Sequence, residues 1–364
     1  MEQTTAKKNK YEIDMCNGTI MDKLISFSLP LMLSGILQLM FNAVDIIVVG
    51  RFSGSQALAA VGSTSALINV FTNLFIGISL GANVLTARFY AAGREKEVSE
   101  TVHTAITLAL VSGIVMALVG LVFSKGALAL MGTPDDVIGL SALYMRIYFL
   151  GMPFFMLYNY GAAILRAVGD TKRPLLFLMI AGVINACLNM VLVIVFKLGV
   201  AGVAIATVIS QMISCVLVLR CLCRSESSYR LRFSELGMKG YYLKQIFSVG
   251  VPAGIQSTVI NFSNVLLQSS VNSFGSTAMA GYTAANNLLG FLYVSVNSIT
   301  QACMSFTSQN YGVGKLKRMD RVLADCMILS VVVAVVLGCI CYGFGPEILQ
   351  IYTEDAEVIA CGME

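Results

Sequence analysis

The chain has 364 residues, of which 57% are hydrophobic and only 12% are charged, and its mean hydropathy is +0.80. Soluble domains carry about 25% charged residues, so this composition excludes a water-soluble globular protein and indicates a protein surrounded by lipid. The net charge of +4 does not indicate a nucleic-acid partner, because membrane topology explains the basic residues better.

Apolar runs of membrane-spanning length follow a polar, basic N-terminal tail at residues 1–22. The tail lacks the apolar segment of a signal peptide, so the first run should remain as a helix. A polar connector at residues 224–244 separates the first six runs from three more, and another helix begins near Val358. The predicted spans are 24–49, 58–82, 102–123, 137–162, 174–196, 201–223, 245–270, 278–301 and 322–344.

The two halves of the chain resemble each other at a shift of 221 positions. The segment 54–59 (GSQALA) lies over 275–280 (GSTAMA), and Gly93 lies over Gly314. A duplicated bundle of membrane helices is typical of secondary transporters, whose substrate path runs between the repeats.

The repeat predicts an all-α membrane protein, a polytopic helical bundle of two pseudo-symmetric six-helix lobes. The N-lobe takes residues 23–223, and the partial C-lobe takes residues 245–364, with three complete helices and the start of a fourth. The second lobe is about 80 residues shorter than the repeat predicts, so we expect the chain to be truncated.

The distribution of basic residues predicts the orientation of the bundle. If the N-terminus is cytoplasmic, 20 of the 24 Lys and Arg residues fall on the inner side, as the positive-inside rule requires. We therefore expect a multi-pass protein of the plasma (inner) membrane. The inner residues are Lys7, Lys8, Lys10, Lys23, Arg88, Arg94, Lys96, Arg166, Lys172, Arg173, Arg220, Arg224, Arg230, Arg232, Lys239, Lys244, Lys315, Lys317, Arg318 and Arg321.

One carboxylate, Asp45, lies within the first apolar run. A charge in the middle of a membrane helix costs about 3 kcal/mol or more, so such a residue is usually kept for function and faces an internal cavity. Gln38 and Asn42 fall on the same helical face as Asp45. An acid near the outer end of the helix that reaches water is the alternative.

Further polar side chains recur at helical spacing and together indicate a wet central cavity, although each alone could simply bond a neighbouring helix. No nucleophile–base pair, phosphate loop or paired-acid metal motif is visible, and the ten cysteines fit small core residues. His103 is expected at the membrane interface. We expect no enzyme activity, no metal site and no cofactor. The polar residues include Asn185, Asn189, Thr207, Gln256, Asn261 and Asn286.

Four segments resemble the multidrug and toxic compound extrusion (MATE) family. They are the segment 38–52, with Gln38, Asn42 and Asp45; the segment 165–174 (LRAVGDTKRP); the segment 199–207 (GVAGVAIAT); and the segment 309–314 (QNYGVG). The likeness runs from about residue 20 to the end, and the motifs are specific only in combination.

The resemblance implies two lobes with a cleft between them that opens alternately to the two sides. It implies export of organic cations in exchange for protons or sodium ions. We expect the transporter to be a monomer. It also implies a coupling-ion site in the N-lobe at Asp45, Asn185, Asn189 and Thr207, beside the cavity-lining candidates Gln38, Phe41, Asn42, Gln256, Asn261 and Asn286.

Two positions depart from the family pattern. Many members carry an acid where this chain has Asn189, and a Tyr where it has Phe41. A flippase for lipid-linked oligosaccharides is the nearest alternative, but its cavity should be more basic than this one. A membrane enzyme acting on lipids would need acid pairs or His clusters, and the duplication argues against a sensor or scaffold.

Overall fold

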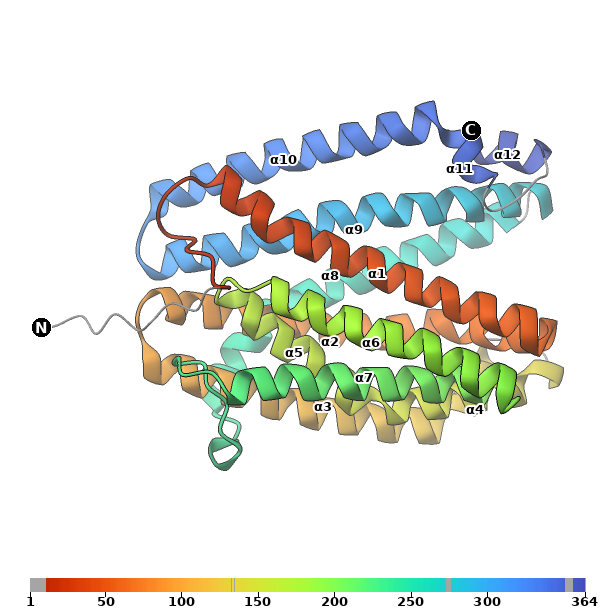
Figure 1. The fold of residues 1–364 in the computed structure, drawn as a ribbon, viewed down its shortest axis with the longest axis horizontal. Helices are drawn as coiled ribbons and strands as arrows, with labels where there is room; N and C mark the ends of the chain where they lie inside the picture. The colour runs from red at the N-terminus through yellow and green to blue at the C-terminus, as the bar shows by residue number, and fades with distance from the viewer. Residues whose placement is uncertain (1–10, 132, 134, 273–275, 351–355, 364) are drawn as a thin grey trace, which may run out of the picture.

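The computed structural model of the protein describes residues 11–131, 133, 135–272, 276–350 and 356–363. These residues form long helices that run side by side along one direction (Figure 1). The N-lobe is α1 (Met21–Ser53), α2 (Ser55–Ala91), α3 (Glu95–Leu130), α4 (Asp135–Leu150), α5 (Met152–Ala167), α6 (Lys172–Asn189) with the π-helix η1 (Met190–Val195), and α7 (Gly199–Cys223). The connector holds the 3-10 helix η2 (Phe233–Glu235), and the C-lobe is α8 (Gly240–Asn272), α9 (Ser276–Gly312), α10 (Leu316–Gly343), α11 (Gly345–Leu349) and α12 (Ala356–Met363).

The helices confirm the predicted duplication. α1 and α8 are both 33 residues long and each contains one proline, Pro30 or Pro252, while α2 and α9 are both 37 residues long. α2 and α9 begin 221 positions apart, as do α3 and α10. The turns after α2 and α9 also match, since Gly93 and Gly314 have φ of 70° and 73°, a left-handed conformation that glycine adopts without strain. Both halves therefore reverse direction in the same way.

The predicted span 137–162 is built from two helices. α4 and α5 meet at Gly151 with a bend of 47°. Pro153, in the first turn of α5, has no backbone N–H to continue the hydrogen bonds of α4. The sequence pattern did not reveal this bend because both helices are apolar.

The outer faces of the bundle suit a lipid environment. Among the described residues, six helices are long and apolar enough to cross a membrane, and the bent α4–α5 pair makes a seventh. α8 and α9 are as long as these but carry more polar side chains. On α10, exposed apolar side chains recur every four residues and so form one continuous face. They are Leu323, Met327, Val331 and Val335.

Two buried apolar cores lie within the bundle, and α1 contributes to both. Its second half, with Val48 and Val49, joins the N-lobe core. Its first half, with Leu24 and Phe27, instead packs with Phe306 and other side chains of α9 and α10. The Phe27 and Phe306 rings meet edge to face, with centroids 5.6 Å apart. α1 thus crosses diagonally from the C-lobe to the N-lobe (Figure 1).

α8 makes the reciprocal contact, packing closely against α2 of the N-lobe. A Cβ added to Gly77 would lie 2.2 Å from the Cα of Gly254, and one added to Gly250 would lie 2.5 Å from the Cα of Ile78. The two backbones touch because glycines face each other, as in close membrane helix pairs. We call the end of the bundle where α1 begins and α2 ends the basic end, since 17 of the 21 Lys and Arg residues that the structure describes belong to its segments.

Candidate functional site

Asp45 lies in the second half of α1, away from the basic end, and its residue is only 8% exposed. The neighbouring Val48 and Val49 fix this part of α1 against the N-lobe core. α6 and α7 pack on the same part of α1. The carboxylate is therefore inside the N-lobe rather than at its surface.

Two polar side chains bond the carboxylate, and a third bonds both of them. The Nδ2 of Asn189, on α6, donates to Asp45 Oδ1. The Oγ1 of Thr207, on α7, lies 3.3 Å from Asp45 Oδ2. Asn189 also donates to the Oδ1 of Asn185 at 3.1 Å. We call these four residues the Asp45 cluster. The structure brings together the four residues that the sequence suggested for the coupling-ion site.

The local form of α6 explains how Asn189 reaches the carboxylate while Asn185 bonds Asn189 and Thr207. They lie four residues apart on α6 and so project from the same face. Directly after Asn189 the chain continues as the π-helix η1, whose wider turn redirects the following residues. Single π-helical turns inside membrane helices are frequent at functional sites.

The hydrogen bonding within the Asp45 cluster is incomplete. The Oδ1 of Asn189 is buried and has no hydrogen-bond partner in the described structure. None of the described Lys, Arg or His residues forms an ion pair with Asp45, whose described partners are the two neutral donors. A buried carboxylate beside an unpartnered carbonyl oxygen can bind a proton or a small cation.

Phe41 lies on α1, one turn before Asp45. Its ring lies directly against Gly182 of α6, where an added Cβ would be 1.7 Å from the ring Cζ. Gly182 is thus the residue that lets α1 approach α6 one turn before Asp45. The other cavity-lining candidates are not part of this buried group. Gln38, Asn42, Gln256 and Asn286 have exposed side chains, and the side chain of Asn261 lies outside the described residues.

Two tyrosines near Asp45 were not singled out from the sequence. Tyr144 and Tyr148 of α4 stack on each other with centroids 6.1 Å apart. Both lie on α4, which packs against α7, the helix that carries Thr207 of the Asp45 cluster. The signal was present, since two Tyr residues one turn apart in an apolar span resemble the Asn185 and Asn189 pair.

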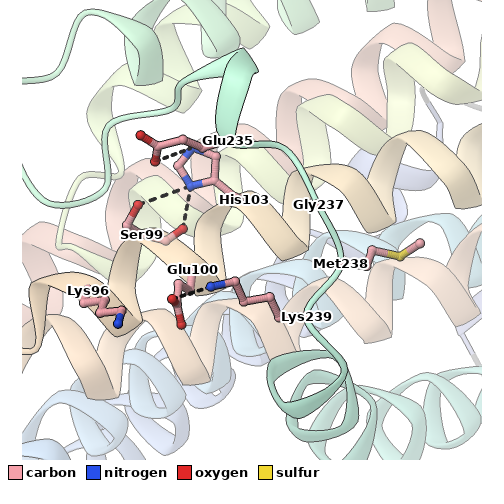
Figure 2. Close-up of a pocket in the computed structure, with 8 residues that line it drawn as sticks. All are labelled: Lys96, Ser99, Glu100, His103, Glu235, Gly237, Met238 and Lys239. Carbon is pink, nitrogen blue, oxygen red and sulfur yellow. Dashed lines mark hydrogen bonds and ion pairs between the residues drawn. The ribbon is translucent and has the colours of Figure 1, made fainter.

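A separate hollow of about 310 Å³ lies at the basic end, between the start of α3 and the connector (Figure 2). His103 is buried there: its Nδ1 lies 2.6 Å from the carbonyl of Ser99, and its Nε2 accepts the N–H of Arg232 at 3.0 Å. The ring is therefore fixed on α3 through Nδ1 and holds the connector through Nε2. The Arg232 guanidinium lowers the pKa of the nearby Glu235. This hollow is far along the bundle from Asp45.

A family model matches most of the chain. Residues 30–191 and 252–364 match the model of the MatE family. The chain belongs to the MatE family. The first matched segment lies in the N-lobe and the second in the C-lobe, and the segment between them contains most of η1, all of α7, the connector and the start of α8.

Curated MatE relatives and solved structures cover nearly the whole chain. A probable multidrug resistance protein YoeA of Bacillus subtilis is 34% identical over 92% of this chain and 73% of its own length. The multidrug export protein MepA of Staphylococcus aureus is 22% identical over 92% of this chain and 74% of its own length. A structure of the outward-facing conformation of a multidrug resistance MATE family transporter has a TM-score of 0.91 at 21% identity, covering 98% and 80% of the two chains.

These matches confirm the membrane-transporter prediction. The protein is a multi-pass membrane protein of the multidrug efflux MatE family, not an enzyme. The flippase alternative is not favoured by any of these relatives.

Proposed function

We propose that this MatE protein is a secondary active exporter that moves organic cations out of the cell in exchange for protons or sodium ions. The observation that carries the proposal is the Asp45 cluster, a buried carboxylate with neutral partners and an unpartnered carbonyl oxygen beside it. The coupling ion is a transported species and not a resident cofactor.

The chemistry of the cluster suits a monovalent cation. An ionised carboxylate in a membrane interior needs a positive partner, and none of the described Lys, Arg or His residues pairs with Asp45. A proton would neutralise the carboxylate directly. A sodium ion would instead be held by Asp45, the free Oδ1 of Asn189, the Oδ1 of Asn185 and the Oγ1 of Thr207, since hard cations prefer oxygen ligands.

Occupancy of the cluster can affect both lobes because α1 belongs to both cores. Asp45 sits in the half of α1 that packs on the N-lobe, and Phe27 sits in the half that packs on the C-lobe. Binding of an ion changes the contacts of α1 with α6 and α7, and so biases which packing of the lobes is stable. Alternating access then follows as a movement of one lobe against the other around a substrate site between them.

The topology and environment complete the proposal. The basic end faces the cytoplasm, the protein lies in the plasma (inner) membrane, and a single chain carries out transport. The substrates are apolar organic cations, in keeping with the multidrug names of the curated relatives.

Efflux of a fluorescent organic cation from vesicles containing the full chain tests the proposal. A proton gradient and a sodium gradient are imposed separately, on the unaltered protein and on Asp45→Asn. At about 4 Å, one unit charge contributes about 4 kcal/mol to cation binding at an effective dielectric constant of 20, which corresponds to about a thousandfold in affinity. We expect one gradient to drive efflux and Asp45→Asn to abolish it.

Matched controls separate the ion site from general effects. Thr207→Val removes the hydroxyl next to Asp45, whereas Ser214→Ala on the same helix removes a hydroxyl that, among the described residues, bonds only the backbone carbonyl of Gln211. We expect weakened coupling only in Thr207→Val. Gradient-driven efflux that persists in a folded Asp45→Asn protein would disprove coupling through Asp45.

A further inference from the structure

Residues 11–20, directly before α1, form a non-helical segment that we call the strap. It was expected to belong to a polar tail, yet Met15 is fully buried in the core that α1 shares with α9 and α10. The strap lies across the basic end of the bundle, between the end of α5 and the start of α10 (Figure 1). Its contacts divide into two sets, one to each lobe.

The first set holds the strap to the N-lobe. The carboxylate of Glu12 accepts the hydroxyl of Tyr90, on α2, at 2.8 Å and that of Tyr229, in the connector, at 2.7 Å. Burial raises the pKa of Tyr229, which keeps its phenol protonated and able to donate. Two hydroxyl donors on one carboxylate are among the stronger hydrogen bonds in proteins.

The backbone of the strap also docks on the loop between α5 and α6. The N–H of Ile13 donates to the carbonyl of Gly169 at 3.2 Å. Gly169 has φ of +98°, and a Cβ there would lie 2.6 Å from the carbonyl oxygen of Ile13. Only glycine fits both the conformation and the space. This gives Gly169, part of the segment 165–174 that the sequence singled out, a defined role.

The second set holds the strap to the C-lobe through its backbone carbonyls. The Nδ2 of Asn310, on α9, donates to the carbonyl of Met15 at 3.1 Å. Further donors come from the turn after α9 and the start of α10. Lys315 reaches the carbonyl of Cys16 at 2.9 Å, and Arg318 reaches that of Asn17 at 3.1 Å.

Direct contacts between the lobes lie beside the strap. Gln309 of the C-lobe donates to the carbonyl of Ala167 at 2.7 Å, and Ser305 donates to Asn83 at 3.1 Å. If the lobes separate at this end, the strap cannot keep both sets of contacts, because Ile13, which bonds the N-lobe, and Met15, which bonds the C-lobe, are only two residues apart. One set of hydrogen bonds must then break, and its donors and acceptors must form hydrogen bonds with water instead.

We propose that the strap is a latch that fastens the two lobes together at the basic end and must release one lobe before the bundle opens there. Because Met15 is buried with the first half of α1 in the core formed with α9 and α10, the strap stays on the C-lobe side, and the N-lobe contacts are the ones that release. The latch assumes the alternating access proposed above.

The test loosens the latch without touching the strap. Tyr90→Phe combined with Tyr229→Phe keeps both rings, which pack together at 6.1 Å, and deletes both donors to Glu12. In vesicles without substrate or ion gradient, the rate of maleimide alkylation is followed by peptide mass spectrometry at two positions. Cys16 reports on the strap, and Ser305→Cys, introduced in every variant, reports on separation of the lobes.

We expect the alkylation rate at both positions to rise about tenfold or more over the parent, since each lost bond to a charged group is worth about a factor of ten. Tyr241→Phe, which alters an exposed ring, is the matched control, and Cys223 at the end of α7 controls for general reactivity.

A rise at Cys16 alone would make the strap a peripheral segment and overturn the proposal, as would no rise at either position. The experiment needs no coupled transport. If coupling through Asp45 were disproved, the alkylation result could therefore still be interpreted. If the latch proposal failed, the efflux experiment on Asp45 would be unaffected.

Discussion

Gly182→Ala should disturb the Asp45 cluster without altering any polar residue. Gly182 lies on α6 one turn before Asn185, and the ring of Phe41 occupies the space where its side chain would be. An added Cβ would lie 1.7, 2.0 and 2.4 Å from three ring atoms of Phe41. Ordinary carbon–carbon contact begins near 3.5 Å, so the ring must retreat by about 2 Å.

Displacement of the Phe41 ring should lower the stability of the protein and change the distance between α1 and α6. Inserting a methyl group into a packed site typically costs about 1–3 kcal/mol. If the ring stays between the helices, α1 moves away from α6, and Asp45, one turn later on α1, moves away from Asn189. We therefore expect a lower unfolding temperature and weaker gradient-driven efflux, with the ion concentration for half-maximal efflux raised by about tenfold.

A double-mutant cycle checks the reasoning. Phe41→Ala creates the space that Gly182→Ala needs, so the double variant should recover part of the stability and efflux that Gly182→Ala loses. Thermal unfolding in detergent and efflux from vesicles are measured for the parent, both single variants and the double variant. Additive effects, or a Gly182→Ala protein that behaves like the parent, would refute the assigned contact between Phe41 and Gly182.

Two further outcomes follow from packing and charge outside the Asp45 cluster. Phe27→Ala should lower the free energy of unfolding by about 3–5 kcal/mol, because Phe27 is fully buried against Phe306. Phe52→Ala, on the exposed side of the same helix, should have little effect. Equal effects of the two substitutions would contradict the assignment of Phe27 to the C-lobe core. Burial raises the pKa of the Asp170 carboxyl in the folded protein, although the neighbouring Arg173 opposes this shift. The carboxyl therefore stabilises the folded state below its ordinary, unfolded-state pKa, and this stabilisation is lost as the pH rises through the folded-state pKa. Asp170→Asn keeps an acceptor for the N–H of Arg173. In this variant the fall in unfolding temperature as the pH rises above about 4 should be smaller than in the parent, and identical profiles would count against this assignment.

Much of the architecture could be predicted from the sequence because its signals are periodic. Apolar runs, the 221-residue shift and the distribution of Lys and Arg were enough for the helices and the lobes. The Asp45 cluster was also accessible, since polar residues in apolar helices are few. The bend at Gly151 was missed because Gly and Pro inside a continuous apolar run do not fix whether a helix continues.

The limits of sequence reasoning are clearest on α1. Gln38, Asn42 and Asp45 share one helical face, as predicted, but only Asp45 is buried. α1 crosses the bundle at an angle, so the same face meets α6 and α7 at one level and is open at another. Helical periodicity predicts which residues share one face of a helix. It does not predict at which level along the helix a neighbouring helix covers that face. The strap was missed for another reason, because its backbone carbonyls carry its C-lobe contacts and they leave no trace in side-chain composition.

The crossing of α1 and α8 says something about how the molecule is joined. The first half of α1 completes the core of the C-lobe, and α8 packs backbone to backbone on α2 of the N-lobe. The first helix of each repeat therefore packs against the other repeat. This is the geometry of a domain-swapped homodimer whose two subunits have been fused into one chain. Cutting the chain in the connector should thus give two pieces that are stable only when they reassociate, each completing the other.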